Sequence, residues 1–392
     1  MSSWPFCRRR AKLRHCIVAA RDFSLKSMPL PRPSPSGHFV TNKLSTALAA
    51  YEGKCILITG AGGFIGAALA VTLAESAPRF LLLLDNSEQN LYQVDMALRE
   101  RGFAAYAPIL GDVCDADLLE EILDCHRPEA VFHSAACKHV PLMERNPLAA
   151  IRTNAIGTWR LANAAARVGV RQLLLISTDK AVNPASVMGA TKRIAELALG
   201  RLHGGQLRLQ AVRLGNVLGS TGSVAPVFAR QIAQGGPVTV THPEVERYFF
   251  TLEEAIDIVL RTSALGPGTF IPKLPPPMKI SELAGRMIRA ARTAATAPVQ
   301  VKFTELRPGD KLREQFVHDA ESCESTQDAL LQLVRGVKIE PQAFDAAMCR
   351  LQELVEQRNL PAVMDILCEL VPGYRPSTSL LQFAHAKSVA KS

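Results

Sequence analysis

The chain has 392 residues, of which 48% are hydrophobic and 21% charged, a balance that is ordinary for a soluble globular protein. This length exceeds the ~250–300 residues at which a single core usually stops growing, so we expect one large domain with a smaller lobe. No run of ~18 apolar residues free of glycine and charge occurs, and we therefore expect no transmembrane segment.

The formal net charge of +9 is concentrated at the N-terminal end. Residues 1–50 contain nine Lys and Arg and one acidic residue, Asp22, so they carry 9 − 1 = +8 and leave +1 for the rest. A basic chain can indicate a nucleic-acid partner, but the nearly neutral remainder argues against one. We interpret residues 1–50 as a disordered basic extension; a misassigned start codon and a targeting or membrane-surface segment are the alternatives.

The nine cysteines are scattered and form no C-x-x-C pair. This spacing favours neither a zinc site nor a redox pair. We therefore expect no metal and a reduced, cytoplasmic setting.

From residue 54 onward, short continuous apolar runs alternate with segments of helical spacing. This pattern predicts a parallel sheet covered on both faces, and crossovers of this length are right-handed almost without exception. The fold class is thus a doubly wound, Rossmann-like α/β protein, whose ligands bind beyond the carboxyl ends of the strands. The expected strands are 55–60, 79–85, 104–112, 129–135 and 171–178, and the expected helices are 64–77, 88–102, 115–126 and 147–169.

After residue 215 the chain is rich in Gly and Pro, which suits a loop-rich lobe made of segments that return to the sheet. Two helices are expected between about 342 and 370. We therefore divide the chain into a dinucleotide-binding domain at 51–215, a smaller lobe at 216–376 and a flexible tail at 377–392, after the extension at 1–50.

The stretch ITGAGGFIG places Gly60, Gly63 and Gly66 between the first strand and the first helix. The first glycine permits a tight turn, the second lets the backbone approach a pyrophosphate, and the third lets helix and strand pack closely. The helix N-terminus adds free N–H groups and partial positive charge for the phosphates. The motif predicts dinucleotide binding.

Asp85 closes the second strand, where a carboxylate accepts hydrogen bonds from the adenosine ribose and repels a 2′-phosphate. This position favours NAD over NADP. Capping of the next helix is the structural alternative, and Ser87 serves it equally well. Asp112, after the third strand, is placed to meet the adenine, with helix capping as its alternative.

The segment STDKAVNPASVMGATKR, residues 177–193, sits where the fifth strand should end. A short-chain dehydrogenase would carry a tyrosine four residues before Lys192, and here that residue is Met188, which has no proton to exchange. Met188 and Lys192 are spaced i, i+4 and so lie on one helix face. Acid–base work would then fall to Asp179 and Lys180.

Five ordered motifs together carry a family resemblance over about residues 50–376. They are GAGGFIG, HSAACKHVPLMERNPLAAIRTNAIGT, STDKAVNPASVMGATKR, RLGNVLGSTGSVAPVFARQIAQGGPVTVTHPEVERYFFT and ELRPGDKLRE. In this order they resemble the UDP-N-acetylglucosamine 4,6-dehydratases, the CapD-like polysaccharide-biosynthesis branch of the extended short-chain dehydrogenases. The resemblance is to the branch with methionine in place of the catalytic tyrosine.

The resemblance implies that a UDP-sugar substrate loses water across carbons 5 and 6 while NAD accepts and returns a hydride. Asp179 would protonate the leaving hydroxyl, Lys180 would take the carbon-5 proton, Thr178 would hydrogen-bond the 4-hydroxyl and Lys192 would bind the nicotinamide ribose. A neutral lysine base needs a depressed pKa and an aspartic acid a raised one. Enclosure favours both neutral forms, whereas their mutual attraction opposes this.

Further roles follow from the resemblance alone. The implied cofactor-binding residues are Gly60, Gly63, Phe64, Ile65, Gly66, Asp85, Asp112, Val113, Ala135 and Lys192. The implied substrate-binding residues are Lys138, His139, Glu144, Met188, Asn216, Ser223, Val224, Arg247 and Arg307. This chain has Asp310 where most relatives have Glu. Asn154 is expected to anchor the sheet and water, and His133 is interpreted as a hydrogen-bonded core histidine rather than a ligand.

Three functions remain open on these grounds. The first is an NAD-dependent UDP-N-acetylglucosamine 4,6-dehydratase for surface glycans. The second is a related UDP-sugar epimerase or lyase, which shares the 4-keto intermediate. The third is a non-catalytic NAD or nucleotide-sugar sensor. A homo-oligomer is expected in each case.

Overall fold

The computed structural model describes residues 46–202, 206–291, 298–336, 339–378 and 380–382. Residues 1–45 of the predicted basic extension lie outside this range. Among the described residues, no helix combines the length and apolarity needed to cross a membrane.

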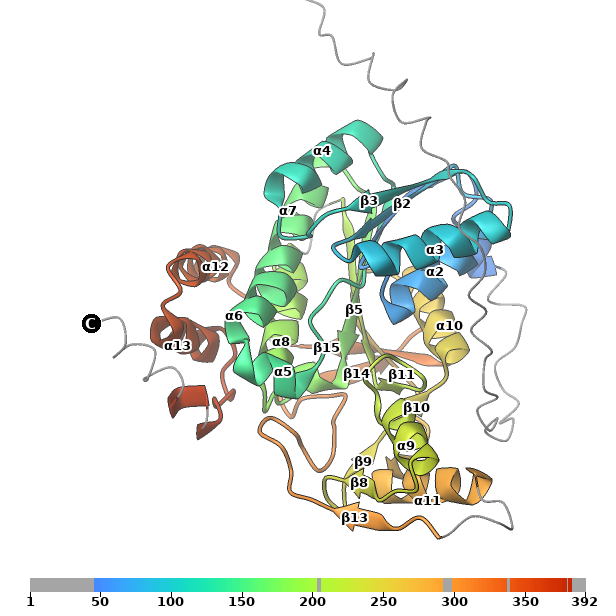
Figure 1. Ribbon diagram of the computed structural model, residues 1–392. Helices are drawn as coiled ribbons and strands as arrows, with labels where there is room; N and C mark the ends of the chain where they lie inside the picture. Colours follow the sequence, from blue (N-terminus) through green and yellow to red (C-terminus); the bar gives the residue numbers. More distant parts are fainter. Residues whose placement is uncertain (1–45, 203–205, 292–297, 337–338, 379, 383–392) are drawn as a thin grey trace, which may run out of the picture. The chain divides into compact units, whose positions relative to one another are not determined.

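A nine-stranded sheet forms the centre of the described chain, in the order β14-β15-β11-β6-β5-β4-β1-β2-β3 (Figure 1). The strands from β3 to β11 pair in parallel, as predicted, but β15 and β14 are antiparallel additions at one edge. Their bounds are β1 (Cys55–Thr59), β2 (Phe80–Asp85), β3 (Tyr106–Leu110), β4 (Ala130–His133), β5 (Gln172–Thr178), β6 (Arg208–Leu214), β11 (Gly268–Pro272), β14 (Ser322–Ser325) and β15 (Leu331–Arg335).

Helices cover both faces of this sheet because both faces of its central strands are apolar. In β1, Ile56 and Ile58 belong to the core on one face, and Cys55 and Leu57 belong to the core on the other. Such strands are buried on both sides and need two helical layers. The first layer contains α2 (Phe64–Ala74), α3 (Glu88–Glu100) and α10 (Leu252–Ser263), and the second contains α4 (Ala116–His126), α7 (Thr158–Val168) and α8 (Val187–Gly200).

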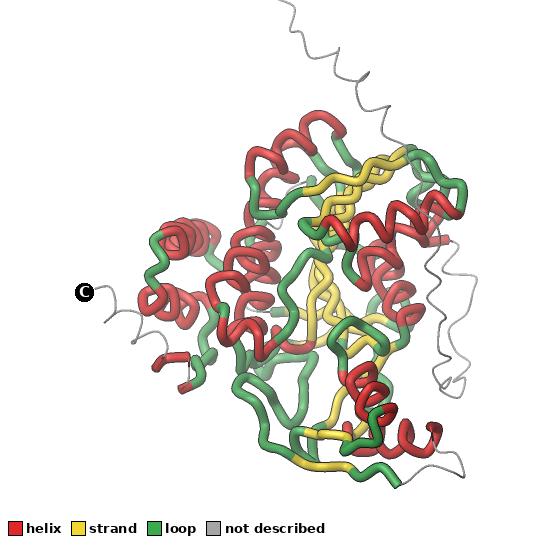
Figure 2. The backbone as a smooth tube through the Cα atoms, viewed as in Figure 1, coloured by secondary structure: helices red, strands yellow, loops and turns green. Residues whose placement is uncertain are grey.

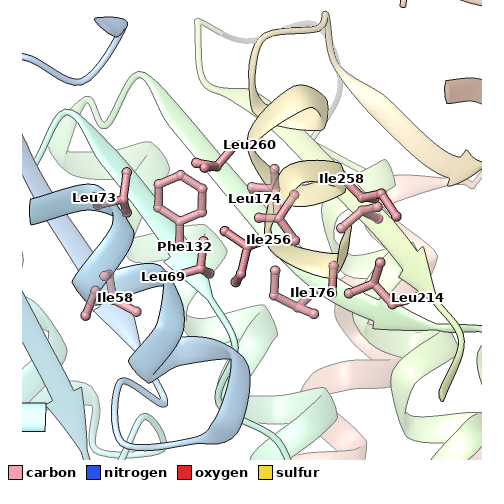
Figure 3. Packing of buried hydrophobic residues seen from close by; sticks show 14 of the residues in the cluster. Ile58, Leu69, Leu73, Phe132, Leu174, Ile176, Leu214, Ile256, Ile258 and Leu260 are labelled. Atoms are coloured by element: carbon pink, nitrogen blue, oxygen red, sulfur yellow. The ribbon is translucent and has the colours of Figure 1, made fainter. Parts of the chain in front are cut away.

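Figure 3 shows the first of these cores, where α2 and α10 meet over the sheet. Leu69 and Leu73 of α2 lie beside Ile256 and Leu260 of α10, and all four are nearly inaccessible to solvent. The helix α10 follows the predicted boundary at 215, yet it packs in the core of the first domain. The second half of the chain therefore contributes this helix to the dinucleotide-type domain.

The segment predicted as one helix over 147–169 is divided in the structure. It consists of α6 (Pro147–Ala150), a π-helical segment η2 (Ile151–Gly157) and α7. π-Helical turns are rare and are frequent at functional sites. Periodicity did not reveal this one, because one extra residue per turn is too small a change over seven residues.

The smaller lobe is built from short elements joined by long loops, as Figure 2 shows in green. Three two-stranded pairings, β7·β10, β8·β13 and β9·β12, hold it together. Their bounds, with those of the two helices, are β7 (Asn216–Val217), β8 (Val238–Val240), β9 (Glu246–Arg247), β10 (Phe249–Phe250), β12 (Met278–Lys279), β13 (Val301–Phe303), α9 (Val224–Ala233) and α11 (Ile280–Ala291).

The C-terminal helices α12 (Pro341–Glu356) and α13 (Leu360–Leu370) confirm the two helices predicted there. They share an apolar core with α5 (Val140–Arg145), η2 and α8. Leu380 is buried in the same core, so the flexible tail predicted from residue 377 does not begin there. Residues 383–392 of that tail lie outside the described residues.

Candidate active site

The carboxyl ends of four neighbouring strands bring the predicted site residues to one edge of the sheet. The parallel register aligns Thr59 of β1 with His133 of β4, and His133 with Leu175 of β5. The loops that follow β1, β4 and β5 therefore leave the sheet side by side. They are the glycine turn, the segment from Ser134 and the segment that contains Asp179.

Two positions of the glycine turn leave no room for a side chain. Gly60 has φ +67°, and a Cβ added to it would lie 2.5 Å from the backbone N of Ala135. A Cβ on Gly66 would lie 2.0 Å from the carbonyl oxygen of Gly60. Ser134 fastens the turn, since its hydroxyl donates to the carbonyl oxygens of Thr59 and Gly60 at 2.8 and 3.1 Å.

The N-terminus of α2 points out of this turn. Gly63 precedes Phe64 and supplies no side-chain cap, so no side chain competes for the first N–H groups of the helix. A backbone cradle of this kind, followed by an uncapped helix, fits the phosphates of a dinucleotide.

Asp85 braces the glycine turn from the end of β2. Its two carboxylate oxygens accept from the backbone N–H groups of Gly62 at 2.8 Å and Ser87 at 2.9 Å. Ser87 caps α3 by accepting from Asn90, as its sequence position suggested. Asp112 accepts from the backbone N–H of Cys114 at 2.9 Å, a local turn contact.

Thr178, Asp179 and Lys180 form a hydrogen-bonded group at the end of β5. The Thr178 hydroxyl and the Lys180 ammonium both donate to Oδ1 of Asp179, each at 2.9 Å. Asp179 is completely buried, and its second oxygen, Oδ2, has no hydrogen-bond partner among the described residues. A buried polar atom without a partner is costly and calls for an explanation.

Lys180 lies between two carboxylates. Its Nζ is 2.9 Å from Asp179 and 3.9 Å from Glu314, and it donates to Oδ1 of Asn216 at 3.3 Å. Burial by itself would lower the pKa of Lys180. The charges of Asp179 and Glu314 outweigh burial and the repulsion of Arg247, so the pKa is raised above its usual value. Of the two opposing effects that the sequence left open, enclosure and mutual attraction, the attraction prevails at Lys180.

Lys192 differs from Lys180 in this respect. Its ammonium is buried and donates to the carbonyl oxygen of Ile176 at 2.6 Å, and burial lowers its pKa to about 8 although Glu196 acts in the opposite direction. Met188, one turn earlier on α8, is 3% exposed. Met188 thus packs in the apolar core of this region and leaves proton transfer to other residues.

His133 is the core histidine that the sequence suggested. One ring nitrogen is 2.6 Å from the Thr59 hydroxyl and the other 2.8 Å from that of Thr158. Burial, followed by the nearby Lys192, lowers its pKa to about 3, so it stays neutral at ordinary pH.

Asn154 lies in the π-helical segment and fastens the loop after β4. Its amide oxygen accepts from the backbone N–H of Cys137, and its amide nitrogen donates to the Cys137 carbonyl and to the Thr191 hydroxyl. The structure thus gives Asn154 a loop-and-helix anchoring role, whereas the sequence suggested an anchor for the sheet.

The loop after β4 and the helix α5 that follows it carry three residues that the resemblance assigned to substrate. Glu144 is buried and accepts from the backbone N–H of Val187 at 2.8 Å and from the Ser377 hydroxyl at 2.9 Å, so its carboxylate joins α8 to the C-terminal segment. The His139 ring lies against Gly222, at the foot of α9, and Lys138 is exposed beside it.

The remaining implied substrate residues come from the lobe and fall into two groups. Asn216 of β7 contacts Lys180, and Ser223 immediately precedes α9. The Ser223 hydroxyl is buried and lacks a hydrogen-bond partner, and Val224 opens α9 behind it without a side-chain cap. Arg247 is buried and donates to the carbonyl oxygens of Glu246, Lys311 and Leu312, whereas Arg307 is 56% exposed and pairs with Asp310.

Sequence reasoning missed Glu314 as a functional residue, although it lies in the quoted motif ELRPGDKLRE. Glu314 is buried, 3.7 Å from Arg247 and 3.1 Å from Lys311 in addition to its contact with Lys180. An acidic residue in a loop motif ordinarily indicates a solvated surface, and nothing local shows that this one is enclosed. Among the described residues, His, Cys, Asp and Glu side chains do not assemble into a group that could hold a metal ion.

The fold is that of a Rossmann-like, doubly wound protein with a glycine-rich turn and a charged cluster at the carboxyl edge of its sheet. The family model described as "Polysaccharide biosynthesis protein" matches residues 56–334. The chain belongs to this polysaccharide biosynthesis protein family.

Three curated relatives carry names from capsule synthesis or from nucleotide-sugar chemistry. The "Capsular polysaccharide biosynthesis protein CapD" of Staphylococcus aureus is 42% identical over 71% of this chain, which spans about half (48%) of that relative. The "UDP-N-acetylglucosamine 4,6-dehydratase (inverting)" of Campylobacter jejuni is 33% identical over 69% of this chain and 80% of its own length. A "UDP-glucose 4-epimerase" of Rickettsia rickettsii is 31% identical over the same shares.

Among solved structures, that of Pen from Bacillus thuringiensis matches with a TM-score of 0.63 and 29% identity. The match covers 67% of this chain and 83% of the other. It confirms the predicted fold class.

Proposed function

We propose that this protein is an NAD-dependent sugar-nucleotide 4,6-dehydratase that converts UDP-N-acetylglucosamine into a UDP-4-keto-6-deoxy sugar. The observation that carries the proposal is the 2.9 Å contact between Asp179 and Lys180, at the carboxyl end of β5, two strands from β1, which leads into the glycine turn. Membership of the polysaccharide biosynthesis family agrees with such a product, because surface glycans are assembled from nucleotide sugars.

The residues present fit a dinucleotide. The cradle formed by Gly60 and Gly66 leaves no room for a Cβ, and the uncapped N-terminus of α2 suits the pyrophosphate. Asp85 presents negative charge at the place where NADP would carry its 2′-phosphate, which favours NAD. Lys192 would hold the ribose of the nicotinamide. When bound, the nicotinamide supplies the chemistry of accepting a hydride from sugar carbon 4 and returning one to carbon 6.

The dehydration itself requires one proton donor and one proton acceptor from the chain. Transfer of a proton from Lys180 to Asp179, along their hydrogen bond, produces a carboxylic acid beside a neutral amine. Asp179 then gives that proton to the 6-hydroxyl, which leaves as water, and Lys180 takes the proton of carbon 5. The ion pair is thereby restored. Positioned proton transfers of this kind are typically worth 10²–10⁴-fold in rate.

The buried Oδ2 of Asp179 has a place in this scheme. It is the oxygen of Asp179 that neither Thr178 nor Lys180 contacts, and a substrate hydroxyl that entered this enclosed site would give it the partner it lacks. Thr178 would orient the 4-hydroxyl, and the task of the absent tyrosine would fall to Thr178 with Asp179 or to water.

The diphosphate would lie near the start of α9. The unpartnered hydroxyl of Ser223 and the uncapped helix beginning at Val224 present donors suited to phosphate oxygens. Arg307 has an exposed guanidinium for the same purpose. The hydrogen bonds of Arg247 are with backbone carbonyls and its guanidinium lies 3.7 Å from Glu314, so Arg247 supports this region by holding the loop that contains Glu314.

A UDP-sugar epimerase is the second candidate, supported by the similarity to the Rickettsia relative named UDP-glucose 4-epimerase. The two reactions share oxidation at carbon 4 and differ in the loss of water. The Asp179–Lys180 pair favours dehydration, because epimerisation needs no acid for a departing 6-hydroxyl. A non-catalytic sensor would bind the same ligands without turnover. The cytoplasmic location and a homo-oligomeric state stay predictions.

Incubation with UDP-N-acetylglucosamine, followed by mass spectrometry of the nucleotide sugar, tests the proposal. We expect a product lighter by one water. A product of unchanged mass with inverted carbon 4 would favour the epimerase, and binding without any product would favour the sensor.

The same reaction in deuterated water tests the role of Lys180. The wild type should incorporate solvent deuterium at carbon 5, and Lys180→Ala should lose this incorporation along with about 10²–10⁴-fold of the rate. Lys279→Ala, which removes an exposed lysine paired with Glu244, is the matched control and should behave as wild type. Continued deuterium incorporation by Lys180→Ala would show that another residue is the base.

A further inference from the structure

We propose that Glu314 is a positioning residue that sets the proton occupancy of Lys180 and thereby decides when the Asp179–Lys180 pair can act as acid and base. The idea rests on the proposed function in one respect, namely that Lys180 is the base. Its central claim, that Glu314 controls the protonation of Lys180, is independent of the substrate.

The first step in the argument is geometric. Asp179 and Glu314 contact the same ammonium from two different segments, one at the end of β5 and the other in the loop before β14. Glu314 is 6% exposed, and Lys180 is the more accessible of the two, with 23% of its side chain exposed. Two carboxylates near the partly buried Lys180 amine raise its pKa more than either carboxylate would alone.

The second step concerns what else faces these groups. Arg247 lies 3.7 Å and Lys311 3.1 Å from Glu314, and Asn216 accepts a hydrogen bond from Lys180. Burial by itself would raise the pKa of Glu314, but the three cations around it lower the pKa, so Glu314 stays a carboxylate. The site therefore contains three cations, Lys180, Arg247 and Lys311, and two carboxylates. Lys311 and Arg247 compete with Lys180 for the negative charge of Glu314.

The third step concerns the reaction. The reactive form of the pair, a carboxylic acid beside a neutral amine, arises when a proton moves from Lys180 to Asp179. This transfer removes the electrostatic attraction between Glu314 and Lys180. The charge of Glu314 opposes this transfer, and the cations Lys311 and Arg247 moderate the opposition. Glu314 thus adds to Asp179 in keeping Lys180 protonated in the resting protein.

The test measures the protonation of Lys180 directly. An amine reacts with acetic anhydride only in its neutral form, so the extent of acetylation of Lys180 across a pH series, measured by peptide mass spectrometry, reports its pKa. The exposed Lys279 serves as the internal reference. Protein without added substrate is used, so the readout does not depend on turnover.

We expect Glu314→Gln to move the acetylation midpoint of Lys180 down by about 1–3 pH units, the usual effect of one close opposite charge. Lys311→Met should move it up, because Glu314 is then shared with fewer cations. The two variants should move the midpoint in opposite directions. A general loosening of the site would move the midpoint in the same direction in both variants, so the test distinguishes the two causes. Glu324→Gln, an equal loss of charge at an exposed position of β14, is the matched control and should leave the midpoint unchanged.

The pH dependence of kcat/KM provides the functional readout. Because the Asp179–Lys180 pair must hold one proton to act, kcat/KM should fall at high pH as Lys180 loses that proton, and Glu314→Gln should move this fall to lower pH by the same interval. An unchanged acetylation midpoint in Glu314→Gln, or shifts of equal sign in both variants, would overturn the inference. A shifted midpoint in a protein that does not dehydrate UDP-N-acetylglucosamine would uphold the role of Glu314 and contradict the proposed function.

Discussion

Single residues of this protein show how burial and neighbouring charge act on the same kind of group in opposite directions. Lys180 and Lys192 are both largely enclosed, yet the pKa of Lys180 is raised and that of Lys192 lowered to about 8. The difference lies in the neighbouring groups: two carboxylates contact Lys180, whereas Lys192 contacts a carbonyl oxygen. Burial alone therefore does not decide which amine can become a base.

His133 provides a stability test at the residue scale. Its pKa is about 3 in the folded chain and about 6.5 when unfolded, so between these values the unfolded chain binds the extra proton and stability falls as pH falls. At pH 5 this linkage costs about 2 kcal/mol relative to pH 8. Urea unfolding at both pH values measures the loss of stability between pH 8 and pH 5. This loss should be about 2 kcal/mol smaller in His133→Gln than in the wild type. Equal losses in the two proteins would contradict the assignment.

Local elements are shaped by close approaches that sequence patterns only partly reveal. The glycine turn was predicted because its spacing is a local motif. The division of residues 147–168 into α6, η2 and α7 was missed, although it lets Asn154 reach both the loop after β4 and α8. Hydrophobic spacing reports which face is buried and is insensitive to one extra residue in a turn.

Gly66→Ala tests the element that would hold the dinucleotide. The new Cβ would lie 2.0 Å from the Gly60 carbonyl oxygen, so the turn must open. We expect a loss of about 1–3 kcal/mol in stability, as for other overpacked sites, and loss of the dinucleotide recovered from denatured protein. Gly285→Ala, within α11, is the matched control and should be neutral or stabilising by up to about 1 kcal/mol. Full dinucleotide occupancy in Gly66→Ala would refute the cradle.

At the scale of the whole molecule, a buried ionic network joins the sheet to the returning segment of the chain. Arg213 of β6 is fully buried and pairs with Glu196 of α8 and with Glu321, each at 2.8 Å, and it donates to the Phe316 carbonyl oxygen. Burial would raise the pKa of Glu196, but Arg213 and Arg193 lower it to about 2. The network thus stays ionised across the ordinary pH range.

Arg213→Met tests whether this network holds the molecule together. Removing one partner leaves Glu196 and Glu321 buried without their main counter-charge, which costs about 3–5 kcal/mol. Arg286→Met, which breaks an exposed pair with Glu282 on α11, should change stability by less than about 1 kcal/mol. Urea denaturation measures both, and similar small effects in the two variants would mean that the buried network contributes specificity rather than stability.

The sequence by itself determined the features that depend on neighbours along the chain. Alternating buried strands and helices, the glycine turn, the Ser87 cap and the core position of His133 all follow from local spacing and from residue type. The parallel pairing of the central strands also follows, because helical crossovers of one hand connect strands that run in the same direction.

Tertiary packing decided the rest. The antiparallel strands β15 and β14, the burial of Leu380, the use of Glu144 to hold α8, and the meeting of Glu314 with Lys180 all join segments far apart in the sequence. The physical reason is that the charge state of a group depends on the distance and the desolvation of partners brought by other segments. No local pattern encodes those distances, so the sequence named Asp179 and Lys180 as candidates, and only the folded chain brought Glu314 to Lys180, where both carboxylates raise its pKa.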